Sequence, residues 1–253
     1  MDNGYVKYEV KDKLGIITFF HPKSNSLPAL ILKQLAEAVE YAGQDEKVHT
    51  IILQSDGDKA FCAGASFDEL IEIETFEKGK EFFMGFARVI NAMKKAPKFI
   101  IARVHGKAVG GGVGLVAAAD YAIAVKDASV KLSEYALGIG PNVVGPAVER
   151  KLGRASFSQM SIDFEWYSAE WALNRGLFAK VYATKEELDI ELKKLSTKLS
   201  QASPTAAKEL KTIFWEGTDN WDELLEKRAE ISGYLVLSDY TKNYISQFKN
   251  KNS

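Results

Sequence analysis

The order of apolar and polar positions along the first 180 or so residues is that of an α/β protein. Residues 5–10 alternate in polarity and residues 14–20 are rich in β-forming side chains, which predicts a β-hairpin. Short apolar runs at 51–53, 99–104 and 121–125 predict buried strands, and a weaker one is centred on Val130. Apolar residues at helical spacing lie between these runs, so the fold class is predicted to be α/β.

Helix signals are strongest in four places. Pro28 precedes an amphipathic stretch, residues 76–95 form a long helical pattern that ends before Pro97, and residues 111–119 and 144–152 predict two further helices. Phe82, Phe83, Met84 and Phe86 in the long helix are candidates for the wall of a ligand pocket, although an aromatic stripe is more typical of a core. Asp120 is expected to pin the end of the helix before it.

Strand signals disappear after Thr184. Thr184 and Glu187 form a capping box for a helix that ends near Gln201, and helical sequence restarts at Pro204 with a break at 217–220. We therefore predict a boundary near residue 195, between a core of residues 1–195 and an all-helical region of residues 196–253. The large apolar side chains of this tail are expected to pack either on their own core or on another subunit.

Composition restricts the class of function. The chain is 46% apolar with a formal net charge of -1, and it has no dense basic block, which argues against nucleic-acid binding. It has no apolar run long enough for a membrane span, and its polar beginning lacks a signal-peptide core. The single Cys62 permits no internal disulfide. Together these features favour a cytoplasmic protein, with the lumen of an organelle after processing as the alternative. His21, His49 and His105 lack metal-ligand spacing, and no metal is expected.

The segment from Val104 to Pro141 holds the candidate chemistry. Gly110–Gly112 opens a predicted helix, whose first N–H groups are free to approach a ligand, and Glu134 follows among apolar residues. A carboxylate beside such donors is suited to proton transfer next to a carbonyl group. The spacing Gly112-x-Gly114-x-x-Ala117 also resembles a dinucleotide fingerprint, but the predicted strand 99–104 does not end at its first glycine, which disfavours that interpretation.

A second loop of small residues, 61–67 (FCAGASF), also leads into a helix. Two such loops can direct two backbone N–H groups at one oxygen and form an oxyanion hole without side chains. Tight packing of both loops against the sheet is the structural alternative.

The motifs FCAGASFDEL, VHGKAVGGGVGL and SEYALGIGP, in this order after HPKSNSL, resemble the crotonase (enoyl-CoA hydratase/isomerase) superfamily. The resemblance implies a spiral of ββα units followed by a helical region, and a homotrimer or a dimer of trimers. It assigns acyl-CoA binding and catalysis to residues 1–195 and oligomerisation to residues 196–253. It implies an acyl-CoA thioester as substrate, with coenzyme A as part of the substrate and no further cofactor. It also implies that the thioester oxygen lies between the N–H groups of Ala65 and Gly111, with Glu134 as a catalytic acid/base.

The resemblance further implies a CoA-binding surface on two segments. Its residues are Lys23, Ser24, Asn25, Ser26, Ala63, Gly64, Ala65, Ser66 and Phe67.

The chain departs from the pattern of the family's hydratases at Gly114. Those enzymes carry two glutamates; Glu134 matches the second, whereas Gly114 stands where the first is expected. A single carboxylate can still move a proton from one carbon to another, and isomerases of the family resemble this chain in keeping only the second acid. Double-bond isomerisation of an enoyl-CoA is therefore the favoured prediction.

Two alternatives remain open at this point. One is an enoyl-CoA hydratase (a lyase) with another group as second acid, and the other is a catalytically silent CoA-binding scaffold. Gly114 itself permits two interpretations: close packing of the helix against a neighbour, or space for substrate, a water or a small anion.

Overall fold

A six-stranded sheet forms the centre of the computed structural model, which describes residues 4–252. Its strand order is β1-β2-β4-β7-β9-β12. The hairpin β1–β2 is antiparallel and the other pairings are parallel. The strands are β1 (Tyr5–Lys11), β2 (Leu14–Phe20), β4 (Thr50–Ser55), β7 (Phe99–Val104), β9 (Tyr121–Val125) and β12 (Lys180–Tyr182).

A smaller sheet has the order β11-β10-β8-β5. Strands β5 (Ala60–Cys62), β8 (Lys107–Val109) and β10 (Ser129–Lys131) are parallel, and β11 (Tyr167–Ser168) pairs antiparallel with β10. Two further short strands, β3 (Ser26–Leu27) and β6 (Gly64–Ala65), pair with each other. The β5, β8 and β11 strands were not predicted, because two or three residues are too few to show a periodicity.

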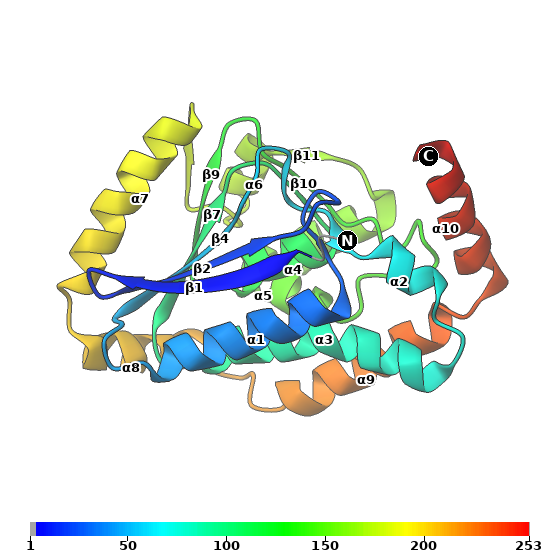
Figure 1. The fold of residues 1–253 in the computed structure, drawn as a ribbon, viewed down its shortest axis with the longest axis horizontal. Coiled ribbons are helices and arrows are strands. Elements are labelled where there is room, and N and C mark those ends of the chain that lie inside the picture. Colours follow the sequence, from blue (N-terminus) through cyan, green and yellow to red (C-terminus); the bar gives the residue numbers. More distant parts are fainter. Residues whose placement is uncertain (1–3, 253) are drawn as a thin grey trace.

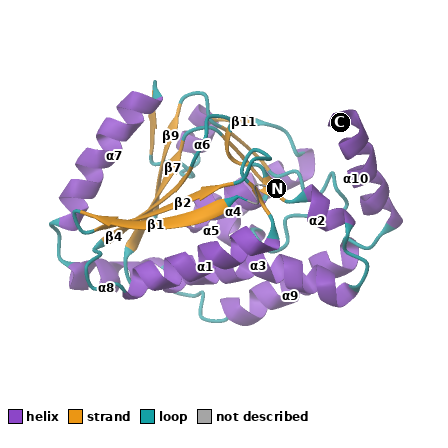
Figure 2. Ribbon diagram, viewed as in Figure 1, coloured by secondary structure: helices purple, strands orange, loops and turns teal. Residues whose placement is uncertain are grey.

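Helices cover the sheets and extend beyond them, with α1, α3 and α9 forming a layer below the larger sheet (Figures 1 and 2). The helices are α1 (Ala29–Gln44), α2 (Phe67–Ile71), α3 (Phe76–Lys95), α4 (Gly111–Ala118), α5 (Gly145–Asp163), α6 (Ala169–Asn174), α7 (Lys185–Ser200), α8 (Pro204–Phe214), α9 (Trp221–Leu235) and α10 (Asp239–Asn252). No described helix is both long and apolar enough to cross a membrane.

The helix predicted at residues 144–152 is longer in the structure. Helix α5 continues to Asp163 across a kink at Gly153, whose φ of 77° and ψ of 158° are not helical. The sequence after Gly153 lacks a clear apolar stripe, so the second half was missed. The long helix α3 has the predicted bounds, since Thr75 caps its first turn and Pro97 lies just beyond its end.

The C-terminal helices pack on the core of their own chain. Helix α9 lies along α3, and the two backbones approach so closely that a Cβ atom at Gly79 would lie 2.8 Å from the Gly233 carbonyl oxygen. The Lys80 ammonium pairs with the carboxylates of Glu226 and Glu230 at 2.7 and 2.9 Å. Oligomerisation by this tail remains a prediction, as does the boundary near residue 195, a position inside α7.

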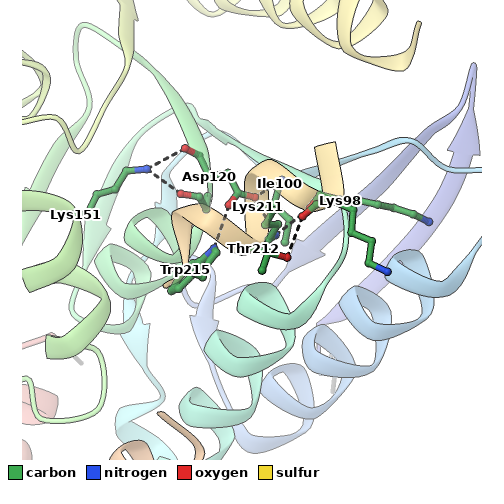
Figure 3. A network of polar contacts seen from close by, with 9 residues as sticks. Lys98, Ile100, Asp120, Lys151, Lys211, Thr212 and Trp215 are labelled. Atoms are coloured by element: carbon green, nitrogen blue, oxygen red, sulfur yellow. Dashed lines mark hydrogen bonds and ion pairs between the residues drawn. The ribbon is translucent and has the colours of Figure 1, made fainter. Parts of the chain in front are cut away.

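Asp120 ties helix α8 to the far end of α4 (Figure 3). Its carboxylate accepts hydrogen bonds from the Ile100 N–H at 2.8 Å, the Lys211 ammonium at 2.9 Å and the Trp215 indole N–H at 3.3 Å. The Lys151 ammonium donates to the carbonyl oxygens of Ala119 and Asp120 at 3.0 Å each. A cation at the C-terminal end of α4 interacts favourably with the helix dipole. This network therefore fixes α4 at the end opposite Gly111.

Candidate active site

Three parallel strands of the smaller sheet lead to the three residues that the sequence singles out. The chain passes from β5 to Ala65, from β8 to Gly111 and from β10 to Glu134. Because the carboxyl ends of parallel strands meet at one edge of a sheet, these residues converge there. All three line a cavity of about 880 Å³, a volume in the range of small-molecule sites.

Backbone groups from the two glycine-bearing loops meet in this cavity. Gly111 is the first residue of α4, so its N–H has no acceptor within the helix and lies at the positive end of the helix dipole. Gly64 adopts a φ of 85°, and a Cβ atom there would lie 2.9 Å from the Val109 carbonyl oxygen and 3.7 Å from the Gly111 nitrogen. The loop that carries Ala65 therefore packs directly on the loop that begins α4.

The carboxylate of Glu134 lies against the start of α4. A Cβ atom at Gly110 would be 2.9 Å from Glu134 Oε1, and Gly110 has a φ of 51°. The Gly110 N–H donates to the Lys131 carbonyl oxygen at 2.8 Å, which joins the two loops. Only glycine at position 110 allows the carboxylate to come this close to Gly111.

The other two glycines of the triplet also permit close packing. A Cβ atom at Gly111 would overlap Cε1 of Phe86, and one at Gly112 would lie 2.7 Å from the Cβ of Cys62. Cys62 is buried, which raises the pKa of its thiol to about 12. The triplet thus brings the helix start into contact with a wall of α3, with the end of β5 and with the acid.

Burial changes the acidity of Glu134. Its Oε2 is inaccessible to solvent and has no hydrogen-bond partner among the described residues. Loss of hydration raises the pKa of the carboxyl group to about 7, while the backbone N–H groups of Glu134 and Ser133 act in the opposite direction. A carboxyl group with a pKa near neutrality is suited both to accept and to return a proton.

Asn142 fixes the turn on which Glu134 is placed. The Glu134 carbonyl oxygen accepts from the N–H groups of Ile139 and Gly140, both at 3.0 Å. The Asn142 side-chain amide donates to the Ile139 carbonyl oxygen at 2.8 Å and to the Ser232 hydroxyl at 3.2 Å. The turn is thereby linked to α9 of the C-terminal tail.

The space beside Gly114 is occupied by a side chain from outside helix α4. A Cβ atom at Gly114 would lie 2.5 Å from Cγ1 and 2.8 Å from the Cβ of Val144. Close packing is therefore the correct interpretation of this glycine, and the alternative of open space for a water or an anion is wrong. An apolar side chain that also lines the cavity is present where a second carboxylate would begin.

The segments predicted to hold CoA form one side of the cavity, with one exception. Asn25 does not line it: its amide donates to the carbonyl oxygens of Asp56 and Ala60, both at 2.8 Å, and it accepts from the His21 N–H. Asn25 is a structural residue of its loop. The remaining predicted positions do line the cavity: Lys23, Ser24, Ser26, Ala63, Gly64, Ala65, Ser66 and Phe67.

Other cavity residues were not recognised from the sequence or were only partly recognised. Phe83 and Phe86 line the cavity, whereas Phe82 and Met84 do not. Ser232 and Tyr244, on α9 and α10, bring the tail into the site. A further wall, which no sequence motif predicted, is formed by Lys131, Phe164 and Trp166. Within the described part of the chain, no group of three or more His, Cys, Asp or Glu residues is placed to hold a metal ion.

The pKa of Glu134 can be tested through stability. The folded-state pKa of about 7 lies above the ordinary value of 4.5, so the folded protein binds more protons than the unfolded chain between these values. Stability is then lost as pH rises from 4.5 to about 7, by at most roughly 3 kcal/mol. We expect urea unfolding at pH 5 and pH 8 to show this loss for the wild type and not for Glu134→Gln. Equal pH dependence of the two proteins would contradict it.

Comparison with known proteins agrees with this geometry. Residues 9–252 match the family model described as enoyl-CoA hydratase/isomerase. The chain is 28% identical to the short-chain-enoyl-CoA hydratase of Clostridium acetobutylicum, over 99% of this chain and 97% of the relative. It is also 28% identical to the crotonyl-CoA hydratase of Syntrophomonas wolfei, over 96% and 94% of the two chains.

The fold matches solved structures of similar proteins. The enoyl-CoA hydratase structure from Bacillus halodurans superimposes with a TM-score of 0.89 over 96% of this chain and 99% of that chain, at 23% identity. The predicted crotonase-like α/β fold with a helical C-terminal region is therefore confirmed.

Proposed function

This chain belongs to the enoyl-CoA hydratase/isomerase family and is an acyl-CoA enzyme, and from that premise we propose that it isomerises the double bond of an enoyl-CoA with Glu134 as its single acid/base. The observation that carries the proposal is the pair formed by Gly114 and Val144. The carboxylate that would help to hold a water for hydration is absent, and Val144 occupies its starting point.

The arrangement supports a two-step proton transfer. The N–H groups of Ala65 and Gly111 hold the thioester oxygen, and Glu134 removes a proton from C2 of a 3-enoyl-CoA. The electron pair passes to the thioester oxygen as a dienolate, whose charge the two N–H groups and the α4 dipole stabilise. Glu134 then returns the proton to C4, and the double bond lies between C2 and C3. No water is consumed.

The electrostatics of the cavity support the same assignment. Among the described residues that line it, the carboxylates are those of Asp68 and Glu134, and Asp68 pairs with Lys23 on the proposed CoA side. Glu134 is left as the carboxylate beside Gly111, with a pKa of about 7. An acid with a raised pKa beside the start of α4 also favours catalysis over a silent CoA-binding scaffold.

Hydration is the second candidate. The relatives named above are called hydratases, which supports it. A hydratase would need another group to orient the attacking water, in place of a carboxylate at position 114.

The two candidates are separated by restoring the missing acid. Gly114→Glu alone is expected to overlap Val144 and to lose about 1–3 kcal/mol of stability. The double variant with Val144→Gly makes room for the new side chain, because it removes both Val144 atoms that a Cβ atom at position 114 would overlap. We expect the double variant to gain hydration of crotonyl-CoA, measured as loss of absorbance of the conjugated thioester. Val144→Gly alone is the control, and fast hydration by this control or by the wild type would contradict the proposal.

A further inference from the structure

One wall of the cavity combines a cation with two aromatic rings. Lys131 ends β10, Phe164 follows α5, and Trp166 precedes β11. The Lys131 ammonium lies 6.0 Å from the centroid of the Phe164 ring and 5.8 Å from that of Trp166. We call these three residues the β11-side wall; all of them line the same cavity as Glu134.

The ammonium of Lys131 has no anionic partner in the wall. Lys131 is half-buried, and its ammonium forms neither an ion pair nor a hydrogen bond with the described residues. Contacts with aromatic faces at about 6 Å compensate only weakly for lost hydration of a charge. The wall therefore presents a positive charge that an anion in the cavity would satisfy.

The backbone at Phe164 holds its ring in this wall at a cost. Phe164 ends α5 in the left-handed conformation, with φ of 40° and ψ of 38°, which is rare for a bulky residue and costs on the order of 1–3 kcal/mol. Its ring lies 6.3 Å from that of Tyr135, the neighbour of Glu134. Strain of this kind concentrates at sites of binding and catalysis.

The position of the wall in the sheet indicates which part of a substrate it would meet. In the smaller sheet, β5 is the strand at one edge and β11 is the strand at the other. Lys59 directly precedes β5, and the proposed CoA segments lie on the β5 side. The strands that lead to Gly111 and Glu134 lie between them. A thioester held at the centre with its CoA toward β5 therefore directs part of its acyl group toward β11.

From these observations we propose that the enzyme takes acyl-CoA substrates whose acyl group carries a distal carboxylate, bound by the Lys131 ammonium between Phe164 and Trp166. The inference rests on the proposed function, because it requires the thioester to lie between Ala65 and Gly111. Lys131 contributes to specificity rather than to acid/base chemistry, since the pKa of Glu134 is set by burial and backbone N–H groups and by no charged side chain.

The test compares two substrates of equal length, 3-hexenoyl-CoA and the CoA monothioester of 3-hexenedioic acid. Wild-type enzyme is expected to prefer the carboxylated substrate. Lys131→Gln is expected to lower kcat/KM for that substrate by about 10- to 100-fold. Its kcat/KM for 3-hexenoyl-CoA should stay within about twofold of the wild-type value. The pH profile with 3-hexenoyl-CoA should not move. Lys107→Gln is the matched control, because Lys107 lies 4.9 Å from the Trp166 ring but does not line the cavity.

Binding separates failure of this inference from failure of the proposed reaction. In a Glu134→Gln background, calorimetry should show tighter binding of adipoyl-CoA than of hexanoyl-CoA, and Lys131→Gln should remove the difference, whether or not the enzyme isomerises either substrate. Equal binding of the two thioesters would overturn the inference. A loss of affinity for both thioesters and for free CoA in Lys131→Gln would also overturn it, because Lys131 would then contact CoA.

Discussion

Replacing Glu134 with glutamine is expected to lower kcat for isomerisation of 3-hexenoyl-CoA by about 10²- to 10⁴-fold. The amide keeps the size and much of the packing of the carboxyl group but cannot accept the C2 proton. No other carboxylate of the described cavity is placed to replace it, since Asp68 is paired with Lys23. Steady-state assays that follow formation of the conjugated thioester measure the loss.

Glu223→Gln is the matched control for this variant. Glu223 is an exposed residue of the first turn of α9, so the same change there should leave kcat unaltered. Because Glu134→Gln retains the oxyanion donors, its affinity for a saturated acyl-CoA should change little. Wild-type turnover by Glu134→Gln would remove Glu134 from the mechanism.

Gly111→Ala is expected to lower kcat by about 10²- to 10³-fold, the effect of losing one oxyanion donor in other enzymes. The added Cβ atom would overlap the buried Phe86 ring, so either the ring or the first turn of α4 must move. Movement of the turn displaces the Gly111 N–H from the thioester oxygen and shifts Gly110 against Glu134.

Gly43→Ala provides the comparison for this substitution. Gly43 is a buried residue of α1, and a Cβ atom there would meet its nearest neighbour, Pro97, at an ordinary 3.4 Å. It should leave kcat unchanged, and circular dichroism should show both variants folded. Normal turnover by a folded Gly111→Ala enzyme would mean that this N–H does not hold the oxygen.

Long periodic elements were predictable from the sequence because their signals are local. The hairpin, the strand Phe99–Val104 and helix α3 all lie where periodicity and their flanking residues placed them. Thr184 accepts a hydrogen bond from the Glu187 N–H at 3.2 Å, as the capping box predicted. Each of these features depends on residues within a few positions along the chain.

The smaller sheet was largely missed for the opposite reason. Its strands have two or three residues each, and their pairing joins segments far apart in the sequence, such as Ala108 with Val130. Yet this sheet brings the ends of β5, β8 and β10 together and so creates the site.

The candidate site likewise combines features that local sequence predicts with features that depend on distant residues. Glu134 and the glycine triplet were visible as motifs, but the reason for each glycine is a distant neighbour: Glu134 itself for Gly110, Phe86 for Gly111 and Cys62 for Gly112. Nothing near Gly114 in the sequence indicates that Val144 packs on it. The structural role of Asn25 likewise depends on the carbonyl oxygens of Asp56 and Ala60, more than 30 residues away.

Product identification with wild-type enzyme tests the central claim most directly. The enzyme is incubated separately with 3-hexenoyl-CoA and with crotonyl-CoA. The products are separated by chromatography and identified against standards of the 2-enoyl and 3-hydroxyacyl thioesters, because 2-hexenoyl-CoA and 3-hexenoyl-CoA have the same mass. Single-acid isomerisation predicts that 3-hexenoyl-CoA becomes 2-hexenoyl-CoA while crotonyl-CoA remains unhydrated. Conversion of crotonyl-CoA to 3-hydroxybutyryl-CoA at a rate equal to or above that of isomerisation would contradict it.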